Sequence, residues 1–415
     1  MTNQPRRQHA LTTLRHRDFR LLWSGQFVST VGDQMQVVAI AWHVYVLTGS
    51  ALQLGLVGAA RAVPFLALTL VGGAVADVTD RRHLLLWVQA ARVITATWLI
   101  VETMRGTVSV TTLYIVTAII SAAQAFDGPA RQALVPNVVP ADELANAYTL
   151  NTLLRQGATV FGPGIGGVLI GTVGLGWTYV ANGISFLVLT AAVVAMRPTP
   201  RTPSATTTRW DLVVGGLRYA VGQPLVLWPL IIDFTTRALG TSRGLLPIFA
   251  KDVFLVGPAG LGWLNVALSA GAVAGGLVLG ARGAIKRPVP VMVAAYGAEA
   301  LGLVFLGLSP TFWLALIVLF GTGLANVVAE VPRITMVQLS TPDELRGRVS
   351  ALSWMFTAGG PQLGQLDTGA AASVLGGPGA ALACGSAAFL SVVIFGIPLL
   401  RRSPNHESPI LNPVT

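Results

Sequence analysis

The chain of 415 residues is 53% hydrophobic and only 11% charged, whereas roughly a quarter of the residues in an ordinary soluble domain are charged. So few charges cannot cover a water-facing surface, and a soluble fold is therefore excluded. Apolar stretches long enough to cross a bilayer as helices, which takes about twenty residues, recur from Phe19 to Leu400.

The positions of the basic residues account for the net charge of +10. Most of the 27 Lys and Arg residues precede the first apolar stretch or fall in every second loop, and the opposite loops hold only Arg105 and Lys251. This alternation is the positive-inside pattern. It predicts a multi-pass protein of the cytoplasmic (inner) membrane with both termini in the cytoplasm, and it argues against a nucleic-acid partner.

Twelve transmembrane helices are predicted, in two sets of six. The first set covers residues 19–47, 51–76, 84–104, 108–127, 144–170 and 174–196, and the second covers 224–250, 257–281, 289–309, 311–332, 346–374 and 379–400. The predicted fold class is an all-α membrane protein whose two six-helix bundles, 19–196 and 224–400, are related by pseudo-two-fold symmetry. Residues 1–18 and 401–415 are predicted to be a cytoplasmic N-terminal segment and a cytoplasmic tail.

A predicted cytoplasmic linker, 197–223, separates the two sets. It begins with the Pro/Thr/Ser-rich stretch "RPTPRTPSATTTR", which indicates flexibility, and "WDLVVGGLRYAVGQP" then predicts a short helix at the membrane interface. The halves also echo each other, since Asp142-Glu143 recurs as Asp343-Glu344 and Asp33 as Asp233. Parallel repeats of this kind occur in transporters whose bundles rock about a midplane site.

The stretch "GGAVADVTDRRH" after the second helix resembles the loop motif of the major facilitator superfamily. The matching positions are Gly73, Asp77, Arg81 and Arg82. Val78 stands where the family usually has a basic residue, and Asp80 where it often has Gly. The resemblance implies a gating role for this loop; the alternative is simple solvation of Asp77 at the interface.

The fifth helix contains "ATVFGPGIGG", which is similar to a glycine–proline motif of exporters in this superfamily. The matching positions are Ala158, Gly162, Pro163, Gly166 and Gly167, and the eighth helix offers a comparable surface in Gly271, Gly275, Gly276 and Gly280. Helix packing through small residues is the alternative explanation. Further stretches, among them "PARQALVPNVVPADELANA", resemble the enterobactin-exporter-like and macrolide-efflux-like branch. The resemblance covers nearly the whole chain, and it implies export.

Charged residues inside the predicted helices are the candidate functional residues, because each costs at least ~2.5–3.5 kcal/mol on insertion scales. Asp33 lies near the middle of its helix among Gln residues and has no opposite charge three or four positions away. Proton coupling or substrate contact is predicted for Asp33, Asp233, Glu299 and Asp367.

Other intramembrane charges have a structural explanation. Two pairs spaced four residues apart, Asp233 with Arg237 and Asp127 with Arg131, are predicted to form ion pairs on one helix face. The residues near helix ends, Glu102, Glu330 and Arg333, are predicted to reach the membrane interface.

The sequence contains no phosphate loop of the form GxxxxGK[ST] and no HExxH element, which argues against ATP-driven pumping and against an enzyme. Cys384 is the only cysteine, and neither a metal site nor a cofactor is expected. We expect a proton-coupled exporter of a small amphipathic drug or siderophore-like metabolite that works as a monomer by alternating access, with the substrate, protons and the lipid bilayer as partners. A transporter of lipid-like metabolites, an uptake carrier and a non-transporting membrane sensor remain alternatives.

Overall fold

A computed structural model describes residues 10–197, 209–283 and 285–402. These residues are almost entirely helical and include no strand, which confirms the predicted all-α class. The helices are α1 (Arg17–Thr48), α2 (Ala51–Val78), α3 (Arg81–Arg105), α4 (Val110–Val138), α5 (Leu144–Thr172), α6 (Gly174–Ala195), α7 (Arg209–Gly222), α8 (Pro224–Leu239), α9 (Ser242–Ile248), α10 (Gly257–Arg282), α11 (Pro288–Gly307), α12 (Phe312–Leu339) and α13 (Asp343–Arg402). Three short helical segments complete the order: η1 (Ala10–Arg15) before α1, η2 (Ala141–Glu143) between α4 and α5, and η3 (Phe249–Val253) between α9 and α10. The predicted linker stretch at 198–208 lies outside the described residues.

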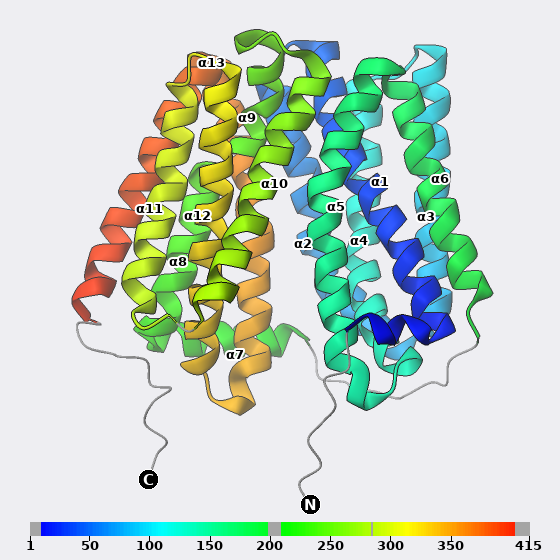
Figure 1. The fold of residues 1–415 in the computed structure, drawn as a ribbon, viewed down its shortest axis with the longest axis horizontal. Coiled ribbons are helices and arrows are strands. Elements are labelled where there is room, and N and C mark those ends of the chain that lie inside the picture. The colour runs from blue at the N-terminus through cyan, green and yellow to red at the C-terminus, as the bar shows by residue number, and fades with distance from the viewer. Residues whose placement is uncertain (1–9, 198–208, 284, 403–415) are drawn as a thin grey trace, which may run out of the picture. The chain divides into compact units, whose positions relative to one another are not determined.

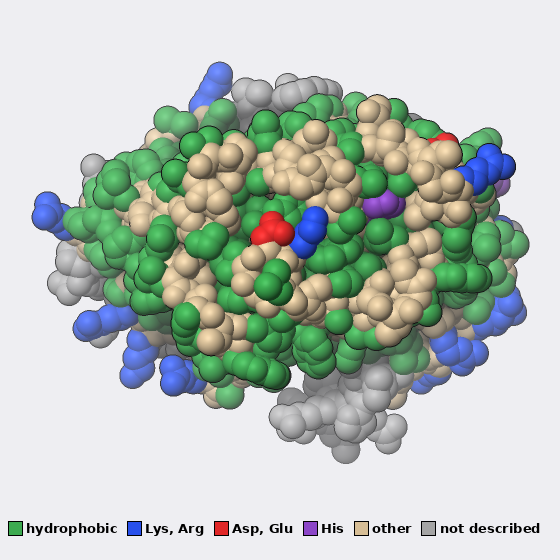
Figure 2. Space-filling model, turned by 90° about the horizontal axis from the view of Figure 1, so that it is seen from above, with side chains coloured by type: hydrophobic (Ala, Val, Ile, Leu, Met, Phe, Trp, Pro, Cys, Tyr) green, Lys and Arg blue, Asp and Glu red, His purple; other side chains and the backbone are tan. Residues whose placement is uncertain are grey.

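The length and apolar composition of the helices support membrane insertion. Within the described residues, eight helices are long and apolar enough to cross a membrane. Large apolar side chains point outward from them, with Trp87 75% exposed and Trp313 73% exposed. Exposed tryptophans of this kind fit a lipid environment, where no hydrophobic penalty attaches to exposed apolar groups. Figure 2 views the helices from above, at their ends, and shows hydrophobic side chains together with charged ones on that face.

The helix pattern is consistent with the predicted count of twelve. The long α13 contains two of the predicted helices, 346–374 and 379–400, and the backbone leaves helical geometry between them at Gly376, where φ is +71°. Glycine adopts this left-handed conformation without the steric penalty of a Cβ. α7 covers most of the predicted interfacial helix.

One predicted helix, 224–250, is wrong as a continuous element. α8 ends at Leu239, Gly240 is extended with φ −164°, and the chain continues as α9 and η3. A Cβ at Gly240 would lie 3.2 Å from the carbonyl oxygen of Cys384, so this backbone approaches α13 closely. Broken transmembrane helices are typical of transporter binding sites.

The contacts divide the chain into two units, Met1–Ala39 with Ala67–Thr206, and Ile40–Leu66 with Thr207–Thr415. In the first unit α3 packs against α4 and α6; in the second α10 packs against α12 and α8 against α13 (Figure 1). The dividing points fall inside α1 and α2, and the predicted bundle limits of 19–196 and 224–400 remain a prediction.

The segment Ile40–Leu66 belongs to the second unit because its small residues approach α13. A Cβ at Gly55 would lie 2.9 Å from the carbonyl oxygen of Gln365, so only glycine permits this spacing. The Tyr45 hydroxyl also donates to the carboxylate of Asp252, and the ammonium of Lys251 lies 5.1 Å from the Tyr45 ring. Backbone packing and a polar contact therefore hold this segment in its unit.

Candidate functional site

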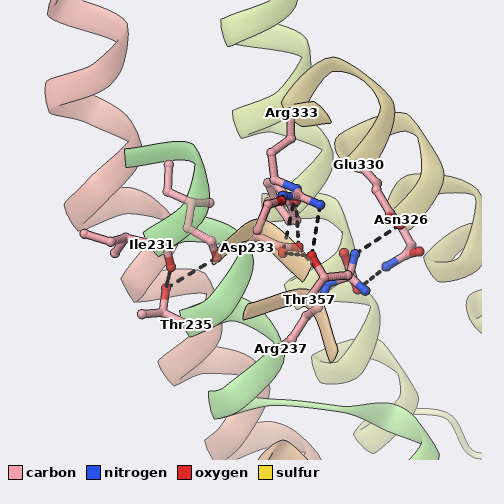
Figure 3. Close-up of polar contacts among 12 residues, drawn as sticks. Ile231, Asp233, Thr235, Arg237, Asn326, Glu330, Arg333 and Thr357 are labelled. Atoms are coloured by element: carbon pink, nitrogen blue, oxygen red, sulfur yellow. Dashed lines mark hydrogen bonds and ion pairs between the residues drawn. The ribbon is translucent and has the colours of Figure 1, made fainter. Parts of the chain in front are cut away.

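A buried charge network occupies the second unit, and Asp233 of α8 lies at its centre (Figure 3). Its Oδ1 lies 2.8 Å from Nε of Arg237 and accepts a hydrogen bond of 2.9 Å from the Tyr296 hydroxyl. Its Oδ2 accepts a hydrogen bond of 3.1 Å from Thr357 and lies 3.7 Å from Nε of Arg333. The predicted ion pair between Asp233 and Arg237 is confirmed, and both carboxylate oxygens have partners.

The prediction that Arg333 and Glu330 reach the membrane interface is wrong for Arg333. Arg333 is 1% exposed and donates to the hydroxyls of Ser353 and Thr357 at 2.8 and 3.0 Å. Glu330 lies 3.3 Å from the Arg237 guanidinium and extends the network along α12 (Figure 3). The position of Arg333 near a predicted helix end was misleading, because α12 continues to Leu339 and leaves this residue inside the helix.

A cavity of about 230 Å³ lies beside this network, where α8 breaks. Its charged lining residues are Arg237, Arg243 and Glu299, and its neutral polar ones include Ser242, Thr322 and Asn326. Leu268, Ala272, Leu303 and Pro361 line its apolar part. The cavity therefore combines an apolar wall with a few polar groups, as small-molecule sites do.

Glu299 of α11 differs from Asp233 in its partners. Its Oε1 accepts a hydrogen bond of 2.8 Å from the Asn326 amide, while its Oε2 is buried and has no hydrogen-bond partner among the described residues. A buried carboxylate oxygen without a donor is costly when ionised. Glu299 can satisfy that oxygen by taking up a proton or by contacting a molecule in the cavity.

A second charge network lies in the first unit and contains Asp33. Asp33 Oδ2 lies 3.2 Å from Nη1 of Arg92, which is 1% exposed and has its guanidinium 5.5 Å from the Phe186 ring. Arg92 Nη2 lies 3.8 Å from Asp127, and Asp127 lies 2.8 Å from Arg131, which confirms the predicted Asp127–Arg131 pair. Asp33 is thus paired across helices, although no opposite charge lies near it in the sequence.

Asp367, the remaining predicted carboxylate, does not line the cavity of the second unit. Its Oδ2 lies 3.6 Å from Sγ of Cys384, the buried cysteine in the same α13 element. This contact was not predictable from spacing, since the two residues belong to different predicted helices.

The gating motif is described in part. Gly73 and Asp77 lie on α2, but their side chains are outside the described set. Arg82 donates to the carbonyl oxygens of Val193 and Val194 at 3.1 and 2.7 Å, near the C-terminus of α6, where backbone carbonyls lack helical partners. Arg81 lies at the first position of α3.

Asp80, which departs from the motif, caps α3. Its carboxylate accepts hydrogen bonds from the backbone N–H groups of Arg82 and His83 at 2.9 and 3.2 Å. Burial acts to raise the pKa of Asp80, but these backbone hydrogen bonds outweigh it and lower that pKa. Two side chains therefore hold the motif loop: Asp80 binds the first turn of α3, and Arg82 binds the end of α6.

The exporter motif packs α5 against α1. A Cβ at Gly162 would lie 2.8 Å from the carbonyl oxygen of Val31, and one at Gly166 would lie 3.0 Å from Cα of Met35. These contacts flank Asp33 on α1. Ala158, Gly162, Pro163, Gly166 and Gly167 are all buried. In α10, by contrast, Gly271 and Gly275 approach α12, whereas Gly276 and Gly280 face open space.

Arg92 and Arg243 have no acidic residue three or four positions away in the sequence, so spacing alone predicted no partner for them. No sequence pattern marked Tyr296, Asn326 and Thr357 as site residues, because uncharged polar residues are common in transmembrane helices. Their part in the site follows only from where the helices bring them.

The family comparison decides the class of protein. The family described as transmembrane secretion effector matches residues 8–412. The chain belongs to this family. It is a multi-pass membrane transporter of the major facilitator type rather than an enzyme.

The chain has relatives along nearly its whole length. It is 26% identical to the enterobactin exporter EntS of Shigella boydii serotype 18 over 389 residues, which cover 93% of this chain and 91% of that protein. The enterobactin exporter EntS of Escherichia coli O81 shows the same identity and coverage.

Solved structures of transporters share the fold of this chain. The nucleoside transporter NupG, in a mutant form, superposes with a TM-score of 0.72 at 14% identity, covering 93% of this chain and 100% of that one. A bacterial homologue of the iron transporter ferroportin gives a TM-score of 0.71 at 15% identity, with coverage of 94% and 99%. At these identities the likeness concerns the fold alone.

Proposed function

We propose that this transporter exports a small amphipathic molecule by alternating access and couples that export to protons. The observation that carries the proposal is the cavity at the break of α8, where an apolar wall faces Arg237, Arg243 and Glu299. A mixed lining of this kind suits a cargo that has both an apolar body and a polar group. The enterobactin exporters among the relatives support export and make a siderophore the first cargo to test.

Two carboxylates suit proton coupling. Asp33 Oδ1 and Glu299 Oε2 are buried and accept no hydrogen bond within the described residues, while each side chain's other oxygen has a partner. Intramembrane carboxylates facing a bundle interior serve as proton relays in transporters. Asp233, whose two oxygens are both engaged, fits a structural role better, and Asp367 stays a weaker candidate for coupling.

We place both termini in the cytoplasm and the protein in the inner membrane. The support is the alternation of basic loops, with Lys251 on the opposite side. A reporter active only outside the cytoplasm, fused at Thr415 or at Lys251, should give signal only at Lys251. Signal from the Thr415 fusion would overturn this orientation.

Transport by everted membrane vesicles tests the function. Vesicles from a host without its own efflux pumps, energised to acidify their interior, should accumulate enterobactin when they contain the protein, and a protonophore should abolish the accumulation. Vesicles containing Asp33→Asn serve as the matched comparison. Accumulation only in right-side-out vesicles would favour the uptake carrier.

If enterobactin is not moved in either direction, a wider screen separates the remaining alternatives. Drug sensitivity and secreted metabolites are compared between the host with and without the protein. A changed drug or metabolite profile identifies another cargo, including a lipid-like one. An unchanged profile favours the non-transporting sensor.

A further inference from the structure

Arg243 is the residue of the cavity whose charge is not neutralised. It lies on α9 just after the break, lines the cavity and is exposed. In the described part of the chain, no carboxylate oxygen lies within the 4.0 Å of an ion pair with its guanidinium. Because Arg243 lines the cavity without such an ion pair, its guanidinium donors are available to a group that enters the cavity.

The two neighbouring cations, Arg237 and Arg333, already have carboxylate partners. Arg237 lies 2.8 Å from Asp233 and 3.3 Å from Glu330, and Arg333 also contacts Asp233. Glu299 lines the cavity, yet it receives its hydrogen bond from Asn326. The positive charge of Arg243 is therefore the one available to an incoming anion.

The size and lining of the cavity limit what that anion is part of. About 230 Å³ is below the roughly 300–1,000 Å³ of pockets that enclose a whole drug-sized ligand. The space therefore holds one portion of a cargo. Leu268, Leu303 and Pro361 supply an apolar wall for a ring or alkyl group, while Arg243 and Ser242 lie at the polar side.

We propose that this cavity is a subsite for an aromatic or alkyl acid group of the cargo, with Arg243 as the cation that binds its carboxylate or phenolate. The guanidinium provides a planar fork of donors that matches a carboxylate. Glu299 opposes the anion as a like charge, so the subsite binds acids best when Glu299 is neutral. The inference deepens the proposed export function by naming the chemical class of the cargo.

Binding of matched probes to the purified full-length protein in lipid nanodiscs tests the subsite without any transport. The probes are 2-naphthoate and 2-naphthamide, which share a shape and differ in charge, and equilibrium dialysis measures their affinities at neutral pH. The wild type should bind 2-naphthoate saturably and more tightly than the amide. Arg243→Gln should reduce the affinity for 2-naphthoate at least tenfold and leave the amide unchanged.

Three further variants separate charge from folding. Arg243→Lys should retain part of the preference for the acid, and Glu299→Gln should raise affinity for the acid, a sign that a merely structural role does not produce. Arg282→Gln, which alters an exposed Arg at the end of α10, should bind both probes like the wild type. Equal binding of acid and amide, no saturable acid binding, or an unchanged preference in Arg243→Gln overturns the subsite.

The vesicle assay keeps the two proposals distinct. If the protein binds the acid through Arg243 but exports nothing, the export proposal is overturned and the subsite is supported. If the wild-type protein exports cargo but its Arg243→Gln variant keeps the wild-type preference for the acid probe, the export proposal stands and the subsite is overturned.

Discussion

Oδ2 of Asp33 lies 3.2 Å from Nη1 of Arg92, while Oδ1 of Asp33 accepts no hydrogen bond in the described part of the chain. One oxygen thus holds a buried cation from another helix, and the other is free to take a proton. Protonation of Asp33 would weaken its attraction for Arg92 and leave Arg92 to Asp127, 3.8 Å away. An exchange of partners between two carboxylates gives the first unit two charge arrangements that a proton can select between.

Replacing Asp33 by Asn tests this coupling, because the amide keeps the size of the side chain but cannot titrate. We expect Asp33→Asn to abolish accumulation driven by a pH gradient in proteoliposomes while downhill exchange of cargo continues. Asp343→Asn, at a side chain that is 79% exposed, is the control and should accumulate cargo normally. Gradient-driven accumulation at the wild-type level in Asp33→Asn would move the coupling role to Glu299 or Asp367.

Asp233 should behave differently, since it is itself buried and pairs with two cations, Arg237 and the buried Arg333. Removing one member of a buried ion pair leaves an uncompensated charge and costs about 3–5 kcal/mol. We expect Asp233→Asn to lower the thermal unfolding temperature of the purified protein strongly. The double variant Asp233→Asn with Arg333→Met should recover part of the loss, because it removes one of the unpaired charges. A single variant as stable as the wild type that nevertheless loses coupling would contradict the structural role.

Arg82 is expected to affect transport rate more than folding. Its guanidinium joins the start of α3 to the carbonyl oxygens of Val193 and Val194 on α6. Arg82→Gln removes the charged donor and should slow transport several-fold through a changed balance of conformations, with normal amounts of folded protein. Arg82→Lys should be intermediate, because it keeps the charge and loses the planar fork. Asp77→Asn is expected to have the same phenotype, and unchanged rates in both would favour a simply solvated loop.

Gly162 provides a steric test of the α5–α1 contact beside Asp33. A Cβ there would lie 2.8 Å from the Val31 carbonyl oxygen, closer than side-chain carbons approach such atoms. We expect Gly162→Ala to cost about 1–3 kcal/mol of stability, as overpacking does, and to reduce transport. Gly276→Ala, at a glycine of α10 that faces open space, should be tolerated. Equal thermal stability of the two variants would show that α5 and α1 pack less closely than described.

The sequence by itself determined the class of protein and most of its helices. Hydropathy is a local property, and twenty apolar residues in a row have one stable solution in a bilayer, a helix with its backbone hydrogen bonds satisfied internally. The ion pairs Asp127–Arg131 and Asp233–Arg237 were predictable for the same reason, since a spacing of four residues fixes their proximity within one helix. The loop and glycine motifs carried enough information to indicate the superfamily.

Only the tertiary structure decided which charges work together. Asp33 meets Arg92 and Arg333 meets Asp233 across helices, and such pairs depend on the rotation and register of packed helices, which the order of apolar residues does not encode. The break at Gly240 likewise lies where the backbone of Cys384, more than a hundred positions along the chain, approaches closely. The same break brings Arg243 to the cavity without an ion-pair partner among the described residues. The sequence shows which residues can carry a charge, but the folded structure decides which of those charges have an ion-pair partner.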